Sequence, residues 1–223
     1  MNLLNDITLF TCTFNNNLLT KCMIMSCFKQ LKNDIPVIIM DNGTTEICTE
    51  DMKEVFKVID NTNFKLTKNY NQVSRNHCSA IDYALKNCIK TKYVMLCDND
   101  ILFNKNIKTL FDSLDSLKEI DVVGEIGWDF AKGDRLFPYF CIINVEKMNK
   151  ENLSYFDNNS FVENSNKAII KNDTGYSFYE LIKNNWNIKQ IKLKNYIVHL
   201  GGASHRPLQR KDKWLSQNKD LFM

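Results

Sequence analysis

Four short apolar runs in the first half of the chain each end in polar or acidic residues, and they restrict the possible folds. These runs cover residues 7–14, 36–44, 56–61 and 93–100. Segments with apolar residues at helical spacing follow the first run and precede the last, at residues 18–31 and 74–89. Apolar strands that alternate with helices are typical of a mostly parallel central sheet with helices on both faces. The sequence therefore predicts an α/β fold.

The pattern changes in the second half of the chain. Strands are expected at residues 121–130, 135–145 and 195–204, and a helix at residues 174–186. Residues 149–172 are rich in asparagine and are expected to form a loop, while the polar, basic end of the chain predicts a helix or a flexible tail. No internal repeat or linker divides the sequence, so we expect one domain over residues 1–223.

Composition excludes some classes of protein. Lys and Arg number 29 against 26 Asp and Glu, and the net charge of +3 does not indicate binding to nucleic acid. The eight cysteines form no CxxC pair and several occupy apolar strand positions, so we expect reduced core thiols in a cytoplasmic protein, free in solution or at a membrane surface. The longest apolar run, residues 137–143, is too short to cross a bilayer, and the N-terminus lacks the pattern of a signal peptide. No transmembrane segment is expected.

Asp98 and Asp100 directly follow the fourth apolar run. Alternation along a strand points their carboxylates the same way, with Asn99 opposite. Two carboxylates at this spacing can hold Mg²⁺ or Mn²⁺ and leave coordination positions open for phosphate oxygens. The alternative is a pair of turn aspartates that cap the following helix. We expect the metal site, because the pair comes straight after a buried strand.

Other polar residues near expected strand or helix ends have both a structural and a functional interpretation. Asp41 can accept hydrogen bonds from a base N–H or a ribose hydroxyl, or can belong to an Asp-Asn-Gly turn. Arg75, at a helix start, can pair with a phosphate or a base edge, although an isolated arginine there is more often a surface residue. His77 shares a helix face with Ile81 and is expected to pack. Asp173, taken alone, is typical of a helix N-cap.

The last expected strand carries His199, which taken alone is typical of a satisfied core histidine. It precedes a Gly-Gly pair that would let the backbone approach a phosphate closely. The cationic and polar side chains beside these glycines suit an anionic leaving group, and they are Ser204, His205 and Arg206.

The order of these segments resembles glycosyltransferases of the GT-A fold, most closely the family 2-like enzymes, including compact ones encoded by large DNA viruses. The matching segments are TLFTCTFNN, IIMDNGTTE, SRNHCSAIDYAL, YVMLCDNDILF, DTGYSF and HLGGASHR, from residue 7 to about residue 206. The resemblance implies a nucleotide-sugar-binding half at residues 1–103, an acceptor-binding half at residues 104–206 and a C-terminal tail at residues 207–223.

The resemblance also implies roles for single residues. Thr11, Thr13 and Asn15 match the first-strand segment that contacts the nucleotide. Asp41 matches the aspartate that binds base or ribose, and Arg75 an arginine of the donor pocket. Asp98-Asn99-Asp100 matches the DXD motif, which binds a divalent cation, Mn²⁺ or Mg²⁺, and the sugar-nucleotide. His199 matches a late histidine that completes the metal or diphosphate site in some members.

The implied activity is transfer of a sugar, from a UDP-linked donor by family expectation, to a glycan or other hydroxyl acceptor with inversion. Asp173 matches the acidic residue that often serves as general base. Two departures matter: Asp41-Asn42 replaces two aspartates, which leaves the nucleotide open, and Asn172-Asp173 replaces Glu-Asp, which makes Glu125 and Asp129 the fallback bases. Trp128, Tyr139 and Phe140 are expected to form an apolar wall for the acceptor sugar, and the alternative for each is a place in the core.

Two other classes of protein remain open. A nucleotidyltransferase that forms sugar-nucleotides would need a glycine- and lysine/arginine-rich loop after the first strand, and TCTFNNNLLTK contains none. A non-catalytic nucleotide- or carbohydrate-binding module would not need the acidic set Asp98, Asp100 and Asp173. Both observations favour a transferase.

Overall fold

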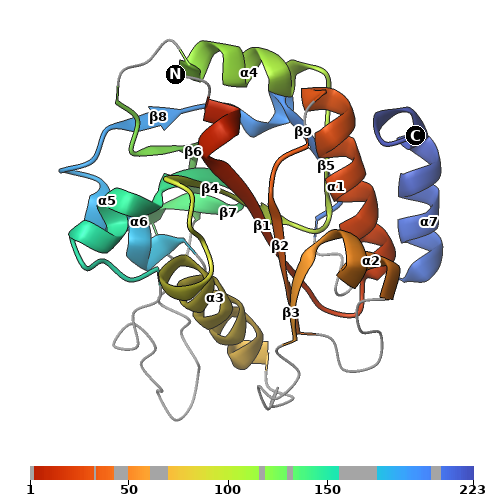
Figure 1. Cartoon of the computed structure of the whole chain (residues 1–223), viewed down its shortest axis with the longest axis horizontal. Coiled ribbons are helices and arrows are strands. Elements are labelled where there is room, and N and C mark those ends of the chain that lie inside the picture. Colours follow the sequence, from red (N-terminus) through yellow and green to blue (C-terminus); the bar gives the residue numbers. More distant parts are fainter. Residues whose placement is uncertain are drawn as a thin grey trace.

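In the computed structural model, strands from both halves of the chain form one central sheet (Figure 1). The structure describes residues 3–32, 34–42, 50–60, 70–115, 119–129, 133–155, 175–201 and 207–223. Within these residues the sheet has seven strands in the order β3-β2-β1-β4-β7-β6-β8. Their bounds are β1 Ile7–Thr13, β2 Val37–Asp41, β3 Lys57–Asp60, β4 Tyr93–Asp98, β6 Val122–Asp129, β7 Gly133–Asn144 and β8 Ile188–Gln190.

The sheet is mostly parallel, which confirms the α/β expectation. β3, β2, β1 and β4 pair in parallel, and β8 pairs in parallel with β6. β7 pairs antiparallel with β4 on one side and with β6 on the other, so it runs against the strands beside it.

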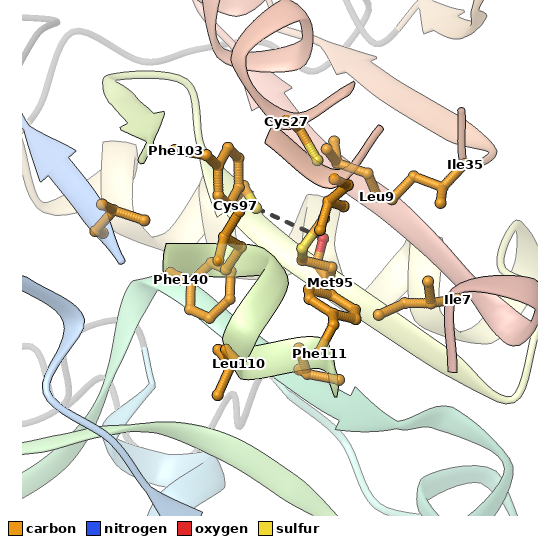
Figure 2. Packing of buried hydrophobic residues seen from close by; sticks show 14 of the residues in the cluster. Ile7, Leu9, Cys27, Ile35, Met95, Cys97, Phe103, Leu110, Phe111 and Phe140 are labelled. Atoms are coloured by element: carbon orange, nitrogen blue, oxygen red, sulfur yellow. Dashed lines mark hydrogen bonds between the residues drawn. The ribbon is translucent and has the colours of Figure 1, made fainter. Parts of the chain in front are cut away.

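Helices cover both faces of the sheet (Figure 1). Their bounds are α1 Asn17–Leu31, α2 Glu50–Val55, α3 Tyr70–Asn87, α4 Asn106–Asp115, α5 Val145–Lys150, α6 Tyr176–Ile182 and α7 Leu208–Gln217. α1 and α4 bury Met23 and Phe111 against one face, and Figure 2 shows Cys27 and Phe111 around Met95 of β4. α3, α5 and α6 bury Ile81, Met148 and Phe178 against the other face.

Several elements differ from the sequence-based expectation. Residues that continue the fourth apolar run form a separate short strand, β5 (Ile101–Phe103), which pairs antiparallel with β9 (Ile197–His199) outside the main sheet. β8 and α2 were not expected, because each is short and has no clear apolar period. Most of the expected loop at 149–172 lies outside the described residues.

The C-terminal segment is a packed helix and not a loose tail. α7 lies beside α1 (Figure 1), and Leu215 joins Leu19, Leu102 and Leu200 in a small apolar cluster. Two side chains of α1 also hold the end of the chain, because Lys29 Nζ donates to Asp220 O at 2.6 Å and Gln30 Nε2 donates to Leu221 O at 3.1 Å.

The described cysteines are free thiols, and all of them except Cys12 are buried. Burial raises the pKa of the Cys27 and Cys141 thiols, so both stay protonated at neutral pH. The expectation that most cysteines belong to the core is therefore confirmed for this part of the chain. None of the described helices combines the length and the apolar character needed to cross a membrane.

Gly175 is expected to be intolerant of any side chain. It caps α6 with a left-handed φ of 86°, and a Cβ there would lie 2.2 Å from the Leu136 carbonyl oxygen. Gly175→Ala should lower the free energy of unfolding in urea by about 1–3 kcal/mol through backbone strain, with the clash adding to the loss. Gly201→Ala is the matched control, because Gly201 has a φ of 75° but no described atom within 4 Å of an added Cβ. Equal losses in the two variants would contradict the steric argument.

Candidate functional site

The ends of four parallel strands meet at one edge of the sheet, as the sequence predicts. Thr13 at the end of β1 is in register with Asp41 of β2, and Asp41 is in register with Asp60 of β3. On the other side of β1, Cys12 is in register with Asp98 of β4. Asp41 is only 3% exposed, so this carboxylate lies within the edge and not on the surface. Ligands of open α/β sheets bind at such an edge.

Each acid of the Asp98/Asp100 pair faces an imidazole from another element. Asp98 Oδ1 lies 3.7 Å from Nε2 of His77 on α3, and Asp100 Oδ1 lies 3.3 Å from Nε2 of His199 on β9. His77 was expected to pack on the apolar face of its helix; it is partly exposed, and from the middle of α3 it also faces Asp98. The Asp98 side chain is 28% exposed and that of Asp100 only 7%.

Asn99 lies in the turn after β4, and its side chain contacts β1 and α1. Its Nδ2 donates to Thr13 Oγ1 at 3.4 Å and to Thr20 Oγ1 at 3.3 Å. Thr20 Oγ1 lies 3.0 Å from Thr13 Oγ1 and donates to Asn16 O at 3.1 Å. These contacts connect the turn between Asp98 and Asp100 to β1 and α1.

The contact with Asp100 changes the pKa of His199. Burial lowers the pKa of His199, but its hydrogen bond to Asp100 and the negative charges of Asp100 and Asp98 outweigh burial and raise the pKa overall. A carboxylate as buried as Asp100 needs a partner that stabilises its charge. The same three side chains supply two carboxylates and one imidazole, which suits Mn²⁺ or Mg²⁺.

These donors fit part of a metal coordination shell. No group of three or more His, Cys, Asp or Glu within the described ranges is already gathered around a metal position. Asp98, Asp100 and His199 would hold a cation only with further ligands, such as water or phosphate oxygens.

The other predicted site residues have different outcomes. Thr11 is fully buried in β1, and Asn15, in the turn after β1, has a left-handed φ of 52°. Glu125 Oε2 accepts a hydrogen bond from the Leu193 backbone N–H at 2.6 Å. Phe140 is fully buried and packs edge-on against Phe103, so the expectation that it lines an acceptor wall is wrong. The following lie outside the described residues or have side chains that do: Asp173, Ser204, His205, Arg206, Arg75, Asp129 and Trp128.

Three contributors to the edge were missed by sequence reasoning. Thr20 lies one turn into α1, His77 lies near the middle of α3, and Lys211 of α7 donates a hydrogen bond from Nζ to Asn16 Oδ1. A polar residue on a buried helix face was a usable signal for Thr20. Nothing local in the sequence connects Lys211 to residue 16.

A family model decides the relationship of the chain to known proteins. The model for glycosyl transferase family 2 matches residues 8–193. The chain belongs to glycosyl transferase family 2. A comparison with curated proteins gives no match.

Solved structures similar to this family 2 chain share its fold at low identity. They include the mannosyltransferase PcManGT from Pyrobaculum calidifontis in complex with GDP-Man and Mn²⁺ (11% identity, TM-score 0.51, 83% of this chain and 54% of that one). An active-site mutant of LgtC gives 12% identity and a TM-score of 0.53 over 84% of this chain and 73% of that one. S. aureus TarS in complex with UDP gives 16% identity and a TM-score of 0.51 over 86% and 59%. The fold is GT-A, and the chain spans little more than half of the mannosyltransferase.

Thr20 is expected to stabilise the turn that carries the acidic pair. Thr20→Val keeps the side-chain shape but removes the hydroxyl that contacts Thr13 and Asn99, so it should lower the free energy of unfolding by about 1–3 kcal/mol. Chemical denaturation measures the loss. Thr109→Val, at an exposed position of α4, is the control for the substitution itself. Equal stability of the two variants would show that the network around Asn99 contributes nothing.

Proposed function

We propose that this chain is a glycosyltransferase that moves a sugar from a nucleotide-diphosphate donor to a hydroxyl group of an acceptor. The observation that carries the proposal is the acidic pair, Asp98 and Asp100, at the carboxyl edge of the sheet of a family 2 chain. Asp41, in register beside β1 at the same edge, is the proposed contact to the base or ribose.

We further propose that the reaction depends on Mn²⁺ or Mg²⁺ held by Asp98, Asp100 and His199. The cation would neutralise the charge that develops on the diphosphate as the glycosyl bond breaks. The ligand chemistry of the three side chains supports this assignment, as does the Mn²⁺ bound to the similar mannosyltransferase. The UDP bound to TarS supports a UDP-linked donor, and His205 and Arg206 are the proposed partners of the leaving diphosphate.

Asp173 is the proposed general base, which removes the proton of the acceptor hydroxyl as it attacks the sugar. A single base on the face opposite the leaving group gives inversion. Glu125 is the weaker candidate, because its carboxylate already accepts the hydrogen bond of the Leu193 N–H. Asp129 remains the other fallback, at the end of β6.

Asp100→Asn is expected to abolish donor turnover and Mn²⁺-dependent binding of UDP, because the amide keeps the shape of the carboxylate but lacks its charge. Donor hydrolysis and titration calorimetry measure the two properties, and thermal unfolding checks the fold. Asp112→Asn, on the solvent face of α4, is the charge-matched control. Normal turnover in Asp100→Asn would refute the metal assignment. UDP binding by the wild type without any turnover would favour the non-catalytic module.

Asp173→Asn is expected to retain donor affinity while sugar transfer falls by about 10²-fold or more. Glu125→Gln and Asp129→Asn, measured in parallel, provide the comparison. Loss of donor affinity in Asp173→Asn would make Asp173 a structural cap. A larger loss of transfer in either of the other variants would move the base to that residue.

A further inference from the structure

β7 departs from regular pairing close to the acidic pair. Gly124 of β6 is in register with Cys141, but Ile126 is in register with Leu136, so residues 137–140 of β7 lie opposite Glu125 alone. Pro138 falls within this bulge, where a residue without a backbone N–H is tolerated. On its other side β7 pairs with β4 up to Cys97, the residue before Asp98. Bulges of this kind re-aim side chains next to functional sites.

The bulge begins with an aromatic ring that rests on a glycine. A Cβ at Gly127 of β6 would lie 2.0 Å from the ring of Phe137, so the ring occupies the space that any side chain would need. The Phe137 ring then stacks on that of Tyr139, with centroids 5.2 Å apart and planes 22° apart. β6 thus supports two stacked rings that extend toward β9.

Tyr139 carries the stack to His199. The two rings are 4.3 Å apart with planes at 24°, and the imidazole directs Nε2 to Asp100 Oδ1 at 3.3 Å. β9 is only three residues long and is followed by Gly201 with a φ of 75°. So short a strand fixes the backbone of His199 through its pairing with Ile101, but it does not fix the plane of the ring.

We propose that Tyr139 is a positioning residue: its ring, supported by Phe137, holds the His199 imidazole in the plane that brings Nε2 to Asp100. The consequence for metal and donor binding rests on the proposed function, whereas the placement of the ring does not. Burial and the neighbouring Glu125 raise the pKa of Tyr139 to about 12, so its side chain stays a neutral phenol. The aromatic face of Tyr139, and not its hydroxyl, is what His199 requires.

The placement is tested by NMR of the ligand-free protein. The chain has three histidines, so the imidazole proton signals are few, and a His199→Asn variant assigns those of His199. Protons over an aromatic face resonate upfield. Tyr139→Phe should keep the upfield His199 signals, and Tyr139→Leu should move them toward the values of free histidine. Tyr83→Leu, on the exposed side of α3, should leave them unchanged.

The consequence is tested by calorimetry with Mn²⁺ and UDP. Tyr139→Leu should weaken Mn²⁺-dependent UDP binding by about 10–100-fold, the usual effect of losing a residue that orients a metal ligand. Tyr139→Phe should restore it. Unchanged His199 signals in Tyr139→Leu, or a loss of binding that Phe does not restore, would overturn the proposal. If the wild type binds no UDP with Mn²⁺, the proposed function fails, while the NMR result still decides the placement of His199.

Discussion

The contact between Asp100 and His199 joins parts of the chain that would otherwise have no reason to meet. A carboxylate that is 7% exposed needs partners that stabilise its charge, and that charge in turn raises the pKa of the imidazole. Backbone hydrogen bonds join the same two segments: Leu200 N donates to Asp100 O at 2.9 Å, and β9 pairs with β5. Leu200 then packs with Leu215, which brings α7 against α1.

Strands buried on both faces were predictable because burial on both sides forces an unbroken apolar run. β1, β2 and β4 satisfy that condition, and their ends therefore located Asp41 and Asp98. β8 does not satisfy it, because its three residues are partly or fully exposed and show no repeating pattern of apolar residues. β5 was missed for a different reason. Its apolar residues look like a continuation of β4, and only its pairing with β9, almost 100 residues later, makes it a separate strand.

The candidate site was predictable in its acids and less so in their partners. A carboxylate after a buried strand is visible locally, whereas the imidazole that faces it depends on how distant elements pack. His77 was assigned to an apolar helix face because helical spacing does not show where the helix begins relative to the sheet. Tyr139 was expected to contact an acceptor, but its observed neighbours are Phe137 and His199, which only the bulge in β7 brings together.

The reversed direction of β7 has a consequence for how such a sheet diversifies. The parallel strands end at the edge that carries Asp41 and Asp98. β7 runs in the opposite direction, so it begins at that edge, with the residues that follow Gly133. Substitutions in this hairpin can reshape one side of the edge without shifting the register of β1 with its neighbours. A lineage built on this scaffold can therefore vary one end of this sheet edge while the pairing of β1 with β2 and β4 stays the same.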